Sequence, residues 1–215
     1  MTQSTNFRTA GVKTVMLLGF VVTSCVALFG DHEPTSLPNV PAPELLLDSR
    51  PFPKGWEVDP CGPDPSRCFR ASYATRSFGR FAIPGHVLQH VYRFGNVAAA
   101  KVKYQRVHEV DFGKGRNEPA SEFLPPAEIA YRSPIADEYY LGCGVDIVPA
   151  CEAIFRYGNY FIEFFFNVDK GYVDGVEIKG NGLKIEEVEP ILRAMDERAA
   201  AVLGLRPHAE PTQTP

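Results

Sequence analysis

The chain has 215 residues, of which 45% are hydrophobic and 22% are charged, so it is able to bury a full core as an ordinary globular domain. The net charge is −4 and no run of lysine or arginine is present, which excludes nucleic acid as a partner because phosphate binding needs clustered cations. Setting the two ends aside leaves residues 44–205 as a single domain.

The first 30 residues predict a signal or membrane-anchor segment. Residues 1–13 are polar and carry Arg8 and Lys13, whereas residues 14–30 hold no charge. A short basic region followed by an apolar one is typical of a secretory signal. As a helix the apolar region would span about 25 Å, a little less than a hydrocarbon core of about 30 Å. The positive-inside tendency then places the following domain outside the cytoplasm.

A cysteine lies near the end of this apolar region. The stretch Val22-Thr23-Ser24-Cys25 resembles the lipobox of bacterial lipoproteins, in which an aliphatic and two small residues precede the cysteine. The resemblance implies that Cys25 carries a lipid, becomes the first residue of the mature chain and anchors it in the membrane. Val22 replaces the usual leucine and residues 26–29 stay apolar, so an uncleaved single span and a cleaved, released chain are the alternatives.

Four more cysteines predict two disulfides. An even number of cysteines in an exported chain is typical of disulfide bonds, and four cysteines allow three pairings. We favour the local pairs Cys61–Cys68 and Cys143–Cys151. A four-cysteine zinc site is the alternative, but zinc-binding pairs usually lie two to four residues apart, so no metal is predicted.

The segments next to the domain lack an apolar period. Residues 31–43 contain four prolines and predict an extended tether, and residues 206–215 predict a disordered tail. The domain opens with a short apolar segment at 44–47, and Trp56 is expected to anchor in the core.

The first half of the domain predicts two strands and a helix. Strands are expected at 69–78 and 86–94, where β-branched and aromatic residues are frequent. Asn96 is placed to cap a helix whose apolar residues recur at helical spacing up to about residue 112. Residues 113–134 are rich in glycine and proline and predict a long loop, a kind of segment that often carries function.

The second half predicts three strands, at 138–147, 151–157 and 160–168, and a final helix. The last two strands are joined by Gly158-Asn159, a two-residue hairpin turn. A glycine-rich loop at 169–182 leads to a helix over 185–203, which ends at Gly204.

These elements predict an α+β fold with two main helices packed on a face of an antiparallel sheet, in one domain. This order of elements is similar to that of PsbP-like extracytoplasmic domains. The resemblance implies a non-enzymatic domain that docks onto membrane complexes or binds small ligands.

The strand at 160–168 is aromatic on both faces. Tyr160, Ile162, Phe164, Phe166 and Val168 share one face, and Phe161, Glu163, Phe165 and Asn167 share the other. If both faces are covered, all the rings belong to the core. If one face is open, Phe161, Glu163 and Phe165 form an apolar binding surface with a polar rim.

No set of residues predicts catalysis or a cofactor. His86 and His90 share a strand face but lie about 13 Å apart, too far to ligate one metal ion. The favoured function is therefore binding: the domain docks to a membrane protein complex or senses at the envelope surface. One alternative is a carrier of a small apolar ligand held by Phe161, Phe165 and the final helix. Another is a hydrolytic enzyme with a cleft where His86 or His90 meets Glu163.

Overall fold

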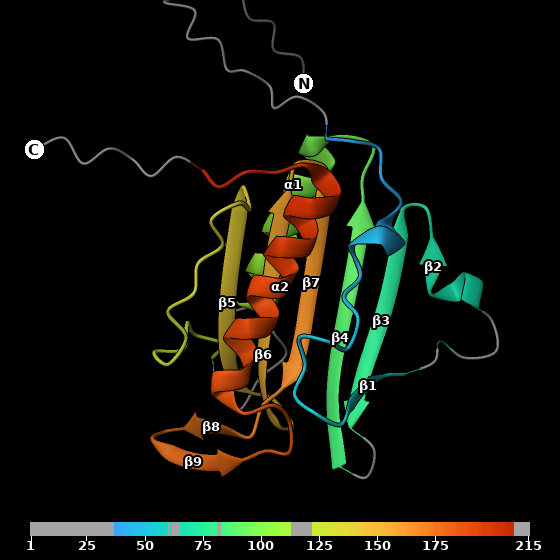
Figure 1. Ribbon diagram of the computed structural model, residues 1–215. Helices are drawn as coiled ribbons and strands as arrows, with labels where there is room; N and C mark the ends of the chain where they lie inside the picture. Colours follow the sequence, from blue (N-terminus) through green and yellow to red (C-terminus); the bar gives the residue numbers. More distant parts are fainter. Residues whose placement is uncertain (1–36, 60, 62–64, 81–82, 113–121, 209–215) are drawn as a thin grey trace, which may run out of the picture. The chain divides into compact units, whose positions relative to one another are not determined.

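The computed structural model describes residues 37–59, 61, 65–80, 83–112 and 122–208, which belong to one compact unit (Figure 1). The signal or anchor segment, Cys25 and residues 31–36 of the tether lie outside the described residues. Among the residues that are described, no helix has both the length and the hydropathy that a membrane crossing requires.

Seven strands of the described chain form one antiparallel sheet in the order β1-β3-β4-β7-β6-β5, with β2 paired to β3. Their bounds are β1 Trp56–Val58, β2 Phe69–Arg70, β3 Tyr73–Arg80, β4 Ile83–Arg93, β5 Glu138–Val145, β6 Pro149–Tyr157 and β7 Tyr160–Asn167. The other elements are the short 3-10 helices η1 Ala42–Leu45 and η2 Pro65–Arg67, helices α1 Val97–Asp111 and α2 Ile185–Leu203, and a separate hairpin of β8 Lys170–Val173 and β9 Val176–Lys179.

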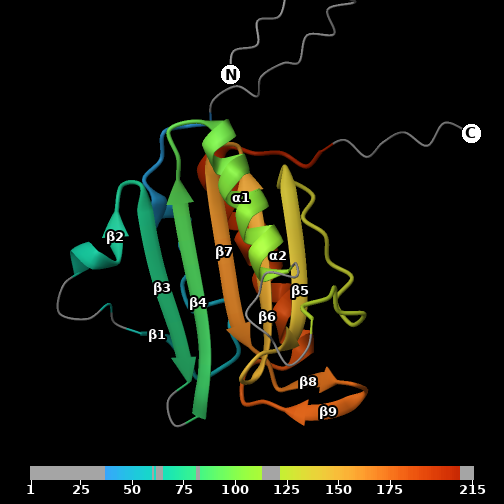
Figure 2. The same cartoon turned by 180° about the vertical axis from the view of Figure 1, so that it is seen from behind.

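The two α-helices lie on opposite faces of the sheet (Figures 1 and 2). The predicted α+β class, an antiparallel sheet with two helices in one domain, is confirmed. The expectation that the helices share a face is wrong. Strand β6 is buried along its whole length, because α2 covers one of its faces and α1 covers the other.

The larger core lies between the sheet and α2. It contains Ile162, Phe164 and Phe166, which share one face of β7, together with Phe155 of β6 and the apolar stripe of α2. The smaller core lies under α1 and consists of Tyr104, Val107, Ile154 and Phe161. The predicted division of β7 into two faces is therefore correct, and each face meets a different helix.

A buried carboxylate ties α2 to the chain that precedes β5. Asp196 is 4% exposed and accepts hydrogen bonds from the hydroxyls of Tyr131, Ser133 and Tyr157. Burial and the nearby Asp196 raise the pKa of Tyr157 well above its usual value, so its hydroxyl remains a donor. This buried hydrogen-bond network around Asp196 thus fixes the position of α2 over the sheet.

The chain from residue 37 onward already packs against the sheet. The hydroxyl of Tyr160 accepts a hydrogen bond from the backbone N–H of Val40, and Ala42 is fully buried. Leu37 lies against Gly158, where a side chain would collide with it. Residues 37–43, which the sequence assigned to the tether, therefore belong to the folded domain.

A buried glutamine holds the next part of this segment. The side chain of Gln89 in β4 accepts from the N–H of Leu47 and donates to the carbonyl of Leu45. We call residues 37–47 the strap, because they run across the end of the sheet and over β4. At the other end of the chain, the N–H of His208 donates to the carbonyl of Pro134, so residues 206–208 also contact the domain.

Both predicted disulfides are present. Cys61 pairs with Cys68, and Cys143 pairs with Cys151 directly across the β5–β6 register. Because the disulfides use all four thiols, these cysteines are unable to ligate zinc. Two disulfides are consistent with an oxidising compartment, which places the domain outside the cytoplasm.

The predicted glycine-rich loop at 169–182 contains the β8–β9 hairpin. Its turn is made by Asp174 and Gly175, with φ of 49° and 80°, the left-handed region that aspartate tolerates and glycine favours. The two strands are short and none of their residues is buried, so they lack the apolar alternation that would reveal them.

Candidate functional site

The face of the sheet that carries α1 is only partly covered. Helix α1 lies over the β5–β7 side, and the described chain places no helix over β3 and β4 on this face (Figure 2). We call the half-buried side chains of this region the open face: Tyr73, Thr75 and Ser77 of β3, Leu88, His90 and Tyr92 of β4, and Glu163 and Phe165 of β7.

The structure separates the three residues of the predicted binding surface. Phe161 is fully buried, with its ring 6.4 Å from that of Tyr104 in α1. Glu163 and Phe165 lie further along β7, where they are half-buried at the margin of the open face. One face of β7 is thus core at its start and surface toward its end, a change that strand periodicity alone does not show.

Aromatic rings dominate one end of the open face. The Tyr73 hydroxyl lies 3.1 Å from Nδ1 of His90, and the Tyr73 and Tyr92 ring centroids are 5.0 Å apart. The ammonium group of Lys103 in α1 lies 5.1 Å from the Tyr92 ring centre and 5.3 Å from that of Phe161. These are cation–π distances, so Lys103 forms a charged border between the open face and α1.

Glu163 and His90 are directly opposite each other in the β4–β7 register. Burial raises the pKa of Glu163, Lys103 opposes that shift and Asp111 adds to it. Burial also lowers the pKa of His90, and Lys103 lowers it further. His90 is therefore neutral at pH 7, and the open face presents aromatic and hydrogen-bonding groups beside the carboxyl of Glu163.

The structure brings together one of the residue pairs that the hydrolase alternative required. His90 and Glu163 are neighbours, whereas His86 is exposed further along β4. Among the described residues, no group of three or more histidine, cysteine, aspartate or glutamate side chains is arranged to hold a metal ion.

The ligand pocket expected between the sheet and the final helix is not formed by the predicted residues. Phe161 and Phe165 lie on the face opposite α2, because side chains alternate along β7. The space between the sheet and α2 is filled by core side chains such as Phe164 and Met195, both fully buried.

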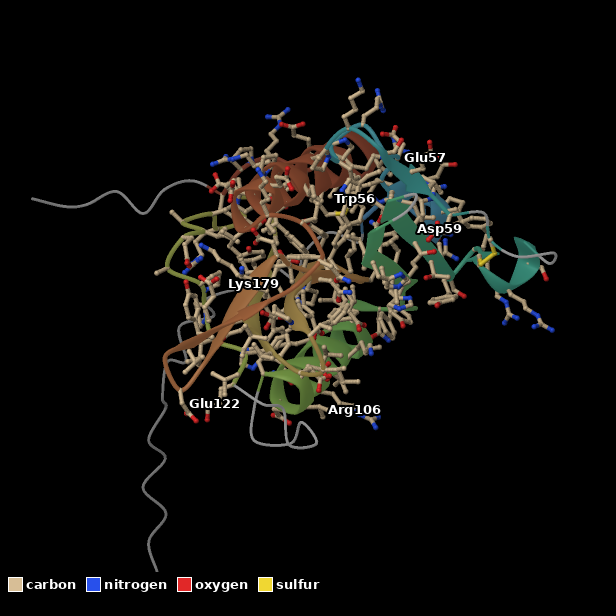
Figure 3. All side chains as sticks on the ribbon, turned by 90° about the horizontal axis from the view of Figure 1, so that it is seen from below. Trp56, Glu57, Asp59, Arg106, Glu122 and Lys179 are labelled. Atoms are coloured by element: carbon tan, nitrogen blue, oxygen red, sulfur yellow. A yellow bond between two sulfur atoms is a disulfide. The ribbon has the colours of Figure 1, made fainter. Side chains whose placement is uncertain are left out.

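A hollow of about 600 Å³ lies beside the β8–β9 hairpin, and the end of the molecule that carries it is seen in Figure 3. Leu124, Pro125 and Pro126 line it from the predicted long loop, and Tyr172 lines it from β8. Leu124 is 56% exposed and Tyr172 is 48% exposed, and charged residues such as Glu122 and Lys170 also line the hollow.

The sequence prediction missed Tyr73, His90, Tyr92 and Lys103 as members of one surface. The two tyrosines and the histidine lie at alternate positions of predicted strands, so their common face was available from the sequence. Which face a helix would leave open was not, because that depends on where α1 crosses the sheet.

No family model, curated protein or solved structure matches this chain.

Proposed function

We propose that this protein is a binding domain anchored at the extracytoplasmic face of the bacterial membrane, where its open face docks onto a protein in or at that membrane. Binding of that partner is the event that such a domain would sense at the envelope surface. The observation that carries the proposal is the uncovered part of the sheet, with its cluster of Tyr73, His90 and Tyr92.

The chemistry of the open face supports a protein partner. Tyrosine is enriched at protein interfaces because it offers a large rigid ring and a hydroxyl at a small cost in conformational entropy. The three rings of the cluster come from adjacent strands, and cross-strand packing holds them in place. Lys103 and Glu163 stand at the margin, where a polar rim is usual.

The N-terminal sequence supports the anchor. The lipobox-like stretch ending at Cys25, or residues 14–30 as an uncleaved span, would hold the domain at the membrane, and the disulfides fit an oxidising compartment. A partner in the same membrane is then met at high effective concentration, which makes a modest interface sufficient.

Site-specific photocrosslinking in native membranes tests the docking. A photoreactive amino acid at Thr75, in the open face, should give one discrete adduct with a membrane protein. The same probe at Glu186, which is exposed on α2, is the matched control and should give none. The adduct should disappear when Tyr92→Ala and His90→Ala are added to the Thr75 probe, provided that circular dichroism shows an unchanged fold.

Equal adducts from the two probe positions, or an adduct that survives the double substitution, would contradict docking through the open face. The anchor has its own test, the mass of the protein extracted from its membranes. A mature chain that begins at Cys25 with added acyl mass supports lipidation, whereas a full-length chain supports an uncleaved span and an unmodified, shortened chain in the soluble fraction contradicts anchoring.

Hydrolysis is a second candidate function, and the adjacency of His90 and Glu163 favours it. A carboxyl with a raised pKa beside a neutral histidine is a pair suited to proton transfer. The matched test compares His90→Gln with His86→Gln against a panel of ester and peptide substrates. An activity that only His90→Gln removes would support an enzyme, and no activity in the wild type would reject it.

A further inference from the structure

A second hollow, of about 610 Å³, lies on the opposite face of the sheet from the open face. It is bounded by the strap and the residues that follow it, by β3 and by α2. An apolar wall lines it together with three arginines and two carboxylates, which are Arg50, Arg76, Arg198, Asp48 and Glu197.

Arg76 is the innermost of the three arginines. Its Nη1 donates to the carbonyl of Leu47, and its guanidinium carbon lies 5.9 Å from the centre of the Phe69 ring. Its Nε is buried and has no hydrogen-bond partner. In the described part of the chain, none of the ion pairs includes Arg76. Arg76 is half-buried, so its guanidinium has lost part of its hydration without gaining a counter-ion from the described residues.

The other charges do not neutralise Arg76. Asp48 is paired with Arg50 at 2.6 Å, and Arg198 donates from Nε to the carbonyl of Glu44 at 2.7 Å. Burial lowers the pKa of Arg76, the charge of Asp48 offsets part of that shift, and the like charge of Arg198 adds to it. Arg198 also pairs with the carboxylate of Glu44 at 3.8 Å, so in the described ion pairs Arg76 is the arginine of the hollow that has no carboxylate partner.

We propose that this hollow binds a small organic carboxylate, whose oxygens meet the guanidinium of Arg76 and whose short apolar body lies against the strap. One guanidinium without an ion pair matches a monoanion better than a phosphate dianion, and the wall of Leu46, Pro51 and Ala194 suits a hydrocarbon group. Arg50 has a side chain that is 87% exposed and stands at the mouth, so it contributes attraction more than contact.

The site is independent of the open face, because the sheet separates the two. It is also independent of the proposed docking, so either proposal is able to fail alone.

Titration of the protein with benzoate tests the site, followed by NMR of the arginine Nε–H resonances. We expect saturable movement of the Arg76 signal, and Arg76→Gln should weaken binding by at least about tenfold, since it removes a charge-assisted contact. Arg198→Gln should weaken binding by a smaller factor. Arg106→Gln, on the exposed side of α1 (Figure 3), is the matched control and should leave it unchanged.

Two further ligands make the outcome decisive. Benzamide has the same ring without the charge, and equal binding of benzamide and benzoate would show an apolar hollow and overturn the carboxylate site. Inorganic phosphate that binds in preference to benzoate would also overturn it. Should Arg76→Gln fail to fold, the Arg76 resonance and the Arg198→Gln affinity decide. No movement of that resonance with benzoate rejects the proposal.

Discussion

At the scale of single residues, two buried polar side chains of this protein are matched to specific partners. Gln89 reaches both Leu45 and Leu47 in the strap, and Asp196 collects three hydroxyls. Each group removes a polar atom from water and regains a partner, which is the condition for tolerating it in a core. Some buried polar atoms of the described residues have no such partner, among them the hydroxyls of Thr75 and Tyr139 and the Nε of Arg76. Of these, Arg76 is the one that carries a charge into a hollow.

The hydrogen-bond network around Asp196 gives the first prediction. Asp196→Asn places an NH₂ group among hydroxyls that now donate to a carboxylate, so the free energy of unfolding should fall by about 2–3 kcal/mol. Urea denaturation measures it. Glu197→Gln removes the same charge one residue further along α2, on an exposed side chain, and should change stability by less than about 0.5 kcal/mol. Equal losses in the two variants would show that charge, rather than the hydroxyl contacts, matters.

Glu163 gives a prediction of pH dependence. The pKa of Glu163 in the folded protein is raised, so burial of this side chain costs no stability below the unfolded pKa of about 4.3, where the carboxyl is neutral in both states. Stability is lost as the pH rises through the folded pKa, because the buried carboxyl becomes charged. Glu163→Gln should therefore be more stable than the wild type at pH 7 and equal to it at pH 3.5. Thermal unfolding at several pH values measures this difference.

The groups that face Glu163 are His90 from β4 and Lys103 and Asp111 from α1. Glu109→Gln, on the exposed side of α1, is the control and should give a difference that does not depend on pH. A gain from Glu163→Gln that is the same at pH 3.5 and pH 7 would contradict the burial of the charge.

At the scale of the elements, the strongest sequence signals gave correct results. Apolar alternation and the Gly158-Asn159 turn located β6 and β7, and the stripe ending at Gly204 located α2. The two elements that the sequence did not predict correctly, the β8–β9 hairpin and the strap, are explained by the burial of their residues. The β8–β9 strands have no buried residue and so leave no apolar pattern. The prolines of the strap resemble a tether although Ala42 is buried.

The candidate site was predictable only in part. Glu163 and Phe165 could be assigned to a face shared with Phe161, but only the crossing of α1 over β6 and β7 decides which of the three is covered. Arg76 gave no signal in the sequence, because its lack of a counter-ion depends on the fold of the strap.

The two disulfides give a prediction at this scale. They close loops with sequence separations of 7 and 8, so the loss of chain entropy in the unfolded state should be nearly the same, about 2–2.5 kcal/mol each. Cys151 is fully buried between β5 and β7, whereas Cys61 and Cys68 are half-buried beside an exposed turn. The double substitution Cys143→Ala with Cys151→Ala should therefore cost more than Cys61→Ala with Cys68→Ala.

Guanidinium denaturation of the two double variants measures the difference, which should be about 1 kcal/mol, the cost of a small cavity. The reverse order would mean that the Cys61–Cys68 loop supports β1 and β2 more than its exposure indicates.

At the scale of the whole molecule, the chain leaves the described domain at one end and carries the β8–β9 hairpin at the other. The strap begins and residues 206–208 end near the start of α1, and the hairpin lies at the far end of the sheet (Figure 1). The open face and the arginine-lined hollow occupy opposite sides between these ends. The proposed docking and the proposed ligand are thus able to act on the domain at the same time.

The strap gives a prediction at this scale. A chain that begins at residue 44 lacks Leu37, Val40 and Ala42 and leaves the Tyr160 hydroxyl without its strap partners. Its free energy of unfolding should be lower than that of a chain beginning at residue 37 by about 2–3 kcal/mol. Chemical denaturation of both chains measures the effect. Equal stability of the two chains would contradict the assignment of residues 37–43 to the folded domain.

The pairing of β4 with β7 has a consequence for how the protein acquires its structure. These neighbouring strands come from residues 83–93 and 160–167, so the middle of the sheet closes only when segments roughly 70 residues apart meet. The β3–β4 hairpin and the β5–β6–β7 meander are local and able to form early, but neither is a complete sheet. Contacts between segments so far apart in the sequence favour slow folding. Until β4 pairs with β7, the unpaired edges of these two strands are open to association with other chains. A chaperone that shields these two strands would prevent such misassociation while the sheet is incomplete.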